Sequence, residues 1–234
     1  MTDLRTPQYR VTVLRAVLFD LDGTLLDTLA DIARTTNTAL AEHGCPLHPA
    51  EAYKRMVGCG MRTLIRRATG RDETSFVDAI ANRVQELYSA DPVGETRPYA
   101  GIVELLDQLK TDHIPMAVLS NKPHRLTVAV IEGTLKADRF VSVVGHSDRI
   151  GRKPDPAGAL EAARALGTDP SEVLFLGDTD VDMQTALRAG MYPVGVAWGF
   201  RPVGELLEAG ARAVVDHPGE VRKLLGSVVE VHDE

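Results

Sequence analysis

Short apolar runs separated by amphipathic segments dominate the chain after residue 95. Near-continuous apolar runs predict buried strands, at residues 14–20, 115–119, 141–145, 172–177 and 192–197. Apolar residues at three- and four-residue spacing predict helices, at residues 100–110, 123–134, 156–166 and 180–189. Short elements near residues 203–208, 213–215 and 219–225 complete this part of the chain. The alternation predicts an α/β fold with a parallel sheet that helices cover on both faces.

Residues 27–94 depart from this alternation because no strand pattern interrupts them. Helical spacing recurs near residues 28–43, 49–57, 61–69 and 73–88. A connection of this size is abnormal between two neighbouring strands, since crossovers are usually short. We therefore expect two domains, a core of residues 1–26 and 95–234 and an all-helical insertion of residues 27–94.

Composition excludes several classes of protein. The formal net charge of −7 argues against a sequence-independent nucleic-acid binder, which needs a basic face. No apolar segment approaches the roughly 20 residues of a membrane span. Residues 1–10 lack the apolar stretch of a secretory signal and are expected to be a frayed extension, and residues 228–234 a loose tail. The two cysteines, Cys45 and Cys59, lack metal-binding spacing and are expected to be reduced thiols in a cytoplasmic protein.

Two acidic residues stand where the first predicted strand ends. Asp20 and Asp22 are followed by a Gly-Thr turn that contains Thr24. Carboxylates this close repel one another, and a cation or a proton must offset the repulsion. In open α/β sheets, ligands bind in the crevice at the carboxyl ends of the strands. The pattern therefore predicts a metal-assisted site with a carboxylate nucleophile.

Three further polar signals follow in order along the chain. Ser120 and Asn121 end the second apolar run, Lys153 lies in a loop that follows, and Asp178 ends a third run. The order Asp, Ser, Lys, Asp, mostly at strand ends, resembles that of the haloacid dehalogenase-like hydrolase superfamily. The resemblance extends from about residue 14 to about residue 225. It implies a Rossmann-like three-layer α/β/α core with an inserted helical cap.

The resemblance also implies roles for these residues. Asp20 would be the nucleophile that forms an aspartyl-phosphate, and Asp22 the general acid and then the general base. A Mg²⁺ ion would be held by the Asp20 carboxylate, the Asp22 backbone carbonyl and Asp178. The Ser120 hydroxyl, with the backbone N–H groups around Asn121, would donate to the phosphoryl oxygens.

The cation beside the nucleophile has three candidates. Lys153 would offset the charge of the nucleophile and the phosphate. Lys122 is its rival, and Arg152 is a weaker one.

Three other polar residues have expected roles. If a helix begins near residue 178, Asp182 lies on the same side as Asp178 and serves as a metal ligand, directly or through water. Asp180 is then expected to be the helix N-cap. Thr24 is expected to orient Asp22 or the loop and to lie near the substrate.

Several stretches are similar to the phosphoglycolate phosphatase type of this superfamily. They include DLDGTLLDT at 20–28, VGCGMRTL at 57–64, SNKP at 120–123 and GDTDVDM at 177–183. Two departures are Cys59, where the family often has Asn, and Asp155, where His is common. Arg62, at a predicted helix start after a glycine hinge, is our candidate for contact with an anionic leaving group.

These observations predict a Mg²⁺-dependent phosphatase of a small phosphorylated metabolite, with 2-phosphoglycolate as the first candidate. A sugar-phosphate mutase or phosphatase and an inorganic pyrophosphatase of the same superfamily remain alternatives. A dehalogenase is disfavoured because that branch replaces the acid at Asp22, and a binding module because the polar set is intact. We expect a monomer or homodimer with no nucleic-acid or membrane partner.

Overall fold

A six-stranded parallel sheet forms the centre of the protein. The computed structural model describes residues 8–232. The strands follow one another in the order β6 (Ser142–His146), β5 (Met116–Pro123), β2 (Ala16–Phe19), β7 (Val173–Gly177), β8 (Tyr192–Val196) and β9 (Ala213–Val215). All neighbouring pairs are parallel. The predicted parallel α/β sheet is confirmed.

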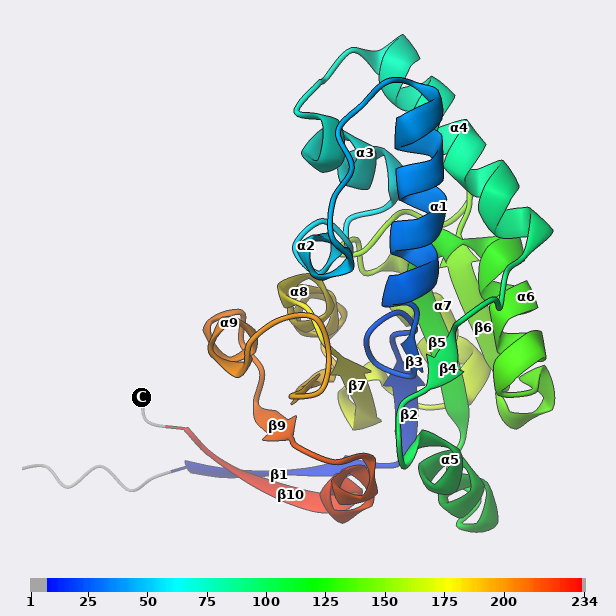
Figure 1. Ribbon diagram of the computed structural model, residues 1–234. Coiled ribbons are helices and arrows are strands. Elements are labelled where there is room, and N and C mark those ends of the chain that lie inside the picture. Colours follow the sequence, from blue (N-terminus) through cyan, green and yellow to red (C-terminus); the bar gives the residue numbers. More distant parts are fainter. Residues whose placement is uncertain (1–7, 233–234) are drawn as a thin grey trace, which may run out of the picture.

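Helices cover both faces of the sheet, as Figure 1 shows. They are α5 (Ile102–Thr111), α6 (His124–Thr134), α7 (Ala157–Leu166), α8 (Asp180–Ala189) and α9 (Val203–Glu208). Alternate residues of β2 enter two separate apolar cores: Val17 and Phe19 pack with α5 and α6, whereas Ala16 and Leu18 pack with α7 and α8. A strand buried on both faces reads as a continuous apolar run. This explains why the sequence pattern located the strand.

Four helices lie between two short strands that lead out of the sheet and back. They are α1 (Leu29–Glu42), α2 (Ala50–Tyr53), α3 (Met61–Thr69) and α4 (Thr74–Ala90). The flanking strands β3 (Leu26–Asp27) and β4 (Arg97–Pro98) pair antiparallel. Figure 1 shows the four helices gathered at one end of the sheet. The predicted helices of this segment are present, although α2 is a single turn.

A buried carboxylate fastens the two connections of this insertion. Asp31 of α1 is fully buried, and its Oδ2 accepts hydrogen bonds from the backbone N–H (2.8 Å) and the hydroxyl (2.7 Å) of Thr96. Its Oδ1 accepts a hydrogen bond from Arg34 at 2.7 Å. Thr96 immediately precedes β4, so this contact joins the start of the insertion to its end.

The chain ends differ from the prediction. Strands β1 (Gln8–Leu14) and β10 (Gly226–His232) form a separate antiparallel pair. The expectation of a frayed extension and a loose tail is therefore wrong for residues 8–10 and 228–232. The other residues to which this expectation applied, 1–7 and 233–234, lie outside the described residues. The error arose because each segment pairs with one more than 200 residues away, and a local pattern does not reveal such a partner.

The remaining described elements are three short 3₁₀ helices. They comprise Ala137–Arg139, Pro170–Glu172 and Pro218–Leu224. Between residues 8 and 232, no helix combines the length and the apolar character that a membrane crossing requires.

Candidate active site

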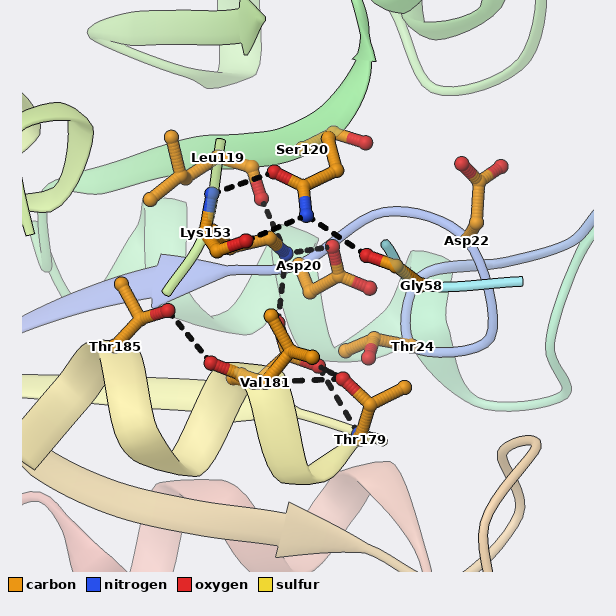
Figure 2. A network of polar contacts seen from close by, with 12 residues as sticks. Asp20, Asp22, Thr24, Gly58, Leu119, Ser120, Lys153, Thr179, Val181 and Thr185 are labelled. Carbon is orange, nitrogen blue, oxygen red and sulfur yellow. Dashed lines mark hydrogen bonds and ion pairs between the residues drawn. The ribbon is translucent and has the colours of Figure 1, made fainter. Parts of the chain in front are cut away.

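The carboxyl ends of β2, β5 and β7 bring the predicted polar residues to one edge of the sheet. Asp20 directly follows β2, and its backbone N–H donates to Leu176 O of β7 at 2.9 Å. Ser120 lies in β5, and Asp178 directly follows β7. Figure 2 shows Asp20, Ser120 and Lys153 close together at this edge. Segments far apart in the sequence therefore build one site.

The turn after β2 requires a glycine. Gly23 has φ +93°, in the region that favours glycine, and its N–H donates to Leu26 O at 2.9 Å. A Cβ at this position would lie 2.2 Å from Asp178 Oδ2. The loop that carries both acids of the motif can thus pack directly on the acid that follows β7.

Lys153 is the cation that contacts the predicted nucleophile. Its ammonium donates to Asp20 Oδ1, to Asp182 Oδ1 at 2.6 Å and to Leu119 O at 3.2 Å. The side chain is almost completely buried. Burial raises the pKa of Asp20 to about 7, and the opposing charge of Lys153 limits that rise. Of the three candidate cations, Lys153 is the one whose charged group contacts the Asp20 carboxylate.

Asp178 is buried without a cation in contact among the described residues. It accepts hydrogen bonds from Phe200 N at 2.8 Å and from the Thr24 hydroxyl at 3.3 Å. Burial raises its pKa well above the ordinary value, and the nearby charges of Asp20 and Asp182 raise it further. An acid in such a place needs a proton or a further cation.

A divalent ion fits this acidic cluster. Carboxylate oxygens of Asp20, Asp178 and Asp182 lie within 4.8 Å of one another, and all three residues are buried. Among the described residues, the one ammonium that contacts these acids is that of Lys153, which pairs with Asp20 and Asp182. Hard oxygen ligands of this kind suit Mg²⁺. The Asp22 side chain lies outside the cluster.

The start of α8 places Asp182 and corrects one expectation. Thr179, and not Asp180, is the N-cap, and it forms a capping box with Asp182. Asp182 Oδ2 accepts from the Thr179 N–H at 3.0 Å and from its hydroxyl at 2.6 Å. One oxygen of Asp182 therefore holds the helix start while the other holds Lys153.

Thr24 and the segment after β8 support Asp178. The Thr24 hydroxyl donates to Asp178 and not to Asp22, which corrects the expected partner. The indole N–H of Trp198 donates to Thr24 O at 3.0 Å. The sequence pattern gave no expected role to Trp198 or Phe200. A signal was available in the VGVAWGF stretch at residues 194–200, because its last four residues follow the end of β8 as the other site residues follow their strands.

Asp22 pairs with a second lysine. Its Oδ1 accepts a hydrogen bond from Lys122 Nζ at 2.7 Å, and both side chains are largely buried. Lys122 Nζ also donates to the hydroxyl of Tyr88 on α4 at 3.3 Å. Figure 2 shows the carboxylate of Asp22 standing apart from that of Asp20. The two acids of the motif thus have separate cations.

Ser120 and Asn121 differ in what they contact. Ser120 lines the cavity, and its hydroxyl oxygen accepts from Lys122 N at 3.1 Å. The Asn121 side chain binds both the N–H (2.7 Å) and the carbonyl (3.1 Å) of Lys153, and it donates to Gly58 O at 2.7 Å. Asn121 therefore fixes the loop of Lys153 and connects it to the helical insertion.

A cavity that opens to solvent lies between the sheet edge and the insertion, and the space free of atoms there, part of it open solvent, is about 670 Å³. Its polar side carries Asp20, Asp22, Ser120 and Lys153. The opposite wall is apolar and comes mainly from the insertion and from α6, with the residues Ile32, Val57, Met61, Leu64, Tyr88, Pro123 and Leu126. A reacting group at Asp20 would face these side chains.

Arg62 is not among the residues that line this cavity. Its guanidinium forms a two-point ion pair with Asp78 of α4, at 2.6 and 3.1 Å, and its side chain is 57% exposed. The structure therefore does not bring Arg62 to the other predicted site residues. Its expected role rested on its position after the glycine hinge, and that position does not reveal the acid on the neighbouring helix.

A buried arginine of the core holds the insertion over the site. Arg201 donates to the backbone carbonyls of Lys54 and of Val57, the latter at 2.9 Å. Glu205, on α9, pairs with Arg55 of the insertion. With Asn121 and Gly58, these contacts close the insertion onto the core in this structure.

Comparisons with known proteins agree with this geometry. A model of the haloacid dehalogenase-like hydrolases matches residues 17–196. The N-acetylmuramic acid 6-phosphate phosphatase of Pseudomonas putida is 32% identical, over 92% of this chain and 98% of that protein. The phosphoglycolate phosphatase of Thiobacillus denitrificans is 36% identical, over 82% of this chain and 88% of that protein.

A solved structure described as a predicted phosphatase from Clostridium acetobutylicum has a similar fold. It superposes with a TM-score of 0.83 at 26% identity, and the match covers 91% of this chain and 98% of that one. The similarity therefore includes the helical insertion as well as the sheet.

Proposed function

The chain belongs to the haloacid dehalogenase-like hydrolase family and is a phosphoric monoester hydrolase, and we propose that it dephosphorylates a small phosphorylated carboxylic acid. The first candidate is 2-phosphoglycolate. The observation that carries the proposal is the buried contact of Asp20 with Lys153 beside Ser120, at the floor of a cavity. This set matches the nucleophile, the cation and the hydroxyl donor that phosphoryl transfer to a carboxylate requires.

In the proposed reaction, a carboxylate oxygen of Asp20 attacks phosphorus while the bond to the leaving oxygen breaks. Asp22 gives its proton to that oxygen, and the product is an aspartyl-phosphate and an alcohol. Asp22 then takes a proton from water, whose oxygen attacks phosphorus and releases Asp20 and inorganic phosphate. Lys153 and the Ser120 hydroxyl offset the charge on the phosphoryl oxygens.

We propose Mg²⁺ as the cofactor, held by Asp20 and Asp178 with Asp182 beside them. When bound, the ion would supply positive charge to the phosphoryl group. The chain supports this arrangement through the N–H of Phe200 and the hydroxyl of Thr24, which orient Asp178. The fit rests on the buried excess of negative charge among these acids.

We further propose that residues 27–94 act as a cap over a core of residues 1–26 and 95–234. The paired strands β3 and β4 support this division because the chain enters the helical segment after β3 and leaves it before β4. A closed cap excludes water from the nucleophile and surrounds the leaving group. We expect the enzyme to work in the cytoplasm, in keeping with its two cysteines, which form no disulfide.

One specific observation favours a second candidate substrate, N-acetylmuramic acid 6-phosphate. Relatives of that name align over nearly their whole length, at 32% and 34% identity. The apolar wall of the cavity also suits a leaving group that is larger than glycolate.

Phosphate release from a panel of esters with Mg²⁺ tests the proposal. The panel contains 2-phosphoglycolate, N-acetylmuramic acid 6-phosphate, hexose phosphates and pyrophosphate, and a separate assay follows isomerisation of hexose 1-phosphates. We expect the highest kcat/KM on one of the two phosphorylated acids and no turnover by Asp20→Asn. Preferred turnover of pyrophosphate, or isomerisation without phosphate release, would contradict the proposal in favour of a pyrophosphatase or a mutase.

A further inference from the structure

Lys122 occupies a place that the phosphoryl chemistry does not explain. Among the described residues that line the cavity, the only cations are Lys153 and Lys122. Lys153 is fully engaged by Asp20, Asp182 and Leu119 O. The side chain of Lys122 is only 7% exposed, and its ammonium lies 4.5 Å from the ring centre of Tyr88. A buried ammonium of this kind is costly unless it serves a partner.

Lys122 lies where its ammonium can contact the leaving group of a substrate. Its backbone N–H donates to Ser120 Oγ, so the residue begins beside the phosphoryl end of the cavity. Its side chain extends to Tyr88 of the insertion, so its ammonium bridges the core and the cap. The neighbouring wall, which includes Met61 and Leu64, offers no charge to an anion. An anionic leaving group in the described cavity therefore has one cation to meet.

The present partner of Lys122 is the residue that must protonate the leaving group. Asp22 Oδ1 lies 2.7 Å from Lys122 Nζ, and the carboxylate of Asp22 stands apart from that of Asp20 (Figure 2). Burial lowers the pKa of Lys122, but the charge of Asp22 and the hydrogen bonds that Lys122 makes to Asp22 and to the Tyr88 hydroxyl outweigh burial and hold the pKa above its ordinary value. Lys122 is thus a cation that needs an anion, and a substrate carboxylate could take the place of Asp22.

We propose that Lys122 and the Tyr88 hydroxyl bind the carboxylate of the leaving group, and that this carboxylate displaces Asp22 from the Lys122 ammonium. The exchange keeps the lysine paired and frees Asp22 to take a proton from solvent and to turn to the leaving oxygen. It makes Lys122 the residue that selects phosphorylated carboxylic acids. This inference rests on the proposed function, and both substrates named for the relatives are carboxylic acids.

Two esters of matched size test the inference. 2-Phosphoglycolate carries a carboxylate where 2-hydroxyethyl phosphate carries a neutral hydroxymethyl group. We expect Lys122→Met to lower the ratio of kcat/KM for the acid to that for the neutral ester by about 10–150-fold, the effect of one charge-assisted contact. Tyr88→Phe should lower the same ratio by roughly two- to tenfold, because it removes one neutral hydrogen bond.

Controls separate this role from others. Lys110→Met removes an exposed lysine of α5 that pairs with Asp138 and does not line the cavity, and it should leave the ratio unchanged. Thermal unfolding shows whether Lys122→Met folds, and Tyr88→Phe, which retains the ring, tests the inference independently. A ratio within threefold of wild type in both folded variants would overturn the inference, even where both rates fall. Failure of the wild type to release phosphate from any ester of the panel would instead overturn the proposed function.

Discussion

Replacement of Lys153 by methionine should destabilise the folded protein even before its effect on catalysis is measured. Methionine fills a similar volume but carries no charge. It would leave the carboxylates of Asp20 and Asp182, which are 8% and 1% exposed, without their ammonium. Removal of one partner from a buried ion pair costs about 3–5 kcal/mol because the other charge stays buried. For a chain of this length, each kcal/mol shifts the melting temperature by about 2–4 °C, so we expect a fall of about 6–20 °C.

Circular dichroism during heating, in EDTA and then in Mg²⁺, measures this effect. Because Mg²⁺ binds only the folded site, it should stabilise the variant by about 2.7 kcal/mol where the ion is at 100 times its Kd. Asp182→Asn should cost less in the Lys153→Met background than alone, because the lost charge no longer has a cation to pair with. The matched control Lys110→Met removes an exposed pair worth about 0–1 kcal/mol.

The outcome that would refute this reasoning is specific. If Lys153→Met unfolds within about 1 kcal/mol of the wild type in EDTA, the acids of the cluster do not depend on that ammonium. Activity offers an independent measurement, because loss of one electrostatic contact to the reacting groups costs about 10²–10³-fold in kcat. Normal kcat in a folded variant would remove Lys153 from the proposed chemistry.

Three further changes test other parts of the site and its connection to the insertion. Asp178→Asn should raise the Mg²⁺ concentration for half-maximal activity by at least about tenfold, and an unchanged metal titration would exclude Asp178 as a ligand. Asp22→Asn should lower the rate of hydrolysis of 2-phosphoglycolate by about 10²–10⁴-fold. The hydrolysis of p-nitrophenyl phosphate should fall much less, because nitrophenolate leaves without a proton. Equal losses on the two esters would argue against proton transfer by Asp22. Asp31→Asn should lower the free energy of unfolding at pH 7 by about 2–4 kcal/mol in urea titrations. Burial acts to raise the pKa of Asp31, but hydrogen bonds from Arg34 and Thr96 outweigh it and hold the pKa below 3.8. The charge of Asp31 therefore contributes fully to the free energy of unfolding above pH 3.8, and this contribution is lost as the pH falls through the lower pKa of the folded protein. An equal loss of unfolding free energy in Asp31→Asn at pH 3 and at pH 7 would contradict this account.

The sheet and the acids at its edge could be predicted because local sequence determines them. A strand that is buried on both faces is apolar throughout, so β2, β5 and β7 stand out and their ends can be located. The carboxyl ends of parallel strands meet at one edge, so Asp20, Ser120 and Asp178 had to lie near one another. The apolar pattern did not predict the order of the strands in the sheet, because that order depends on crossover connections that the pattern does not encode.

Side-chain partners were harder to predict than positions. Thr24 contacts Asp178, which is 154 residues away, and nothing near Thr24 in the sequence distinguishes this acid from Asp22. The role of Arg62 was assigned from its place at a helix start, but Asp78 on the next helix captures its guanidinium. Such pairings depend on how elements pack, which local propensity does not determine.

The two lysines of the site belong to two different ion pairs, one within the core and one that also contacts the insertion. The Lys153–Asp20 pair lies within the core, and Asn121 holds both backbone groups of Lys153. The Lys122–Asp22 pair instead touches Tyr88 of the insertion. In the part of the chain that the structure describes, the hydrogen bonds given for the Lys153–Asp20 pair reach the insertion only indirectly, through Asn121 and Gly58 O. Changes in the side chains of the insertion can therefore alter the leaving group with little effect on the proposed attack on phosphorus.

This division also explains how acids two residues apart can have different tasks. Asp20 pairs with Lys153, and the Asn121 side chain binds both the N–H and the carbonyl of that lysine. This fixed position suits the proposed role of Asp20 as the nucleophile. Asp22 is held by a lysine whose other partner belongs to the insertion, so the contents of the cavity can alter that pair. The geometry therefore couples substrate selection to proton transfer through Asp22 and leaves the nucleophile independent of both.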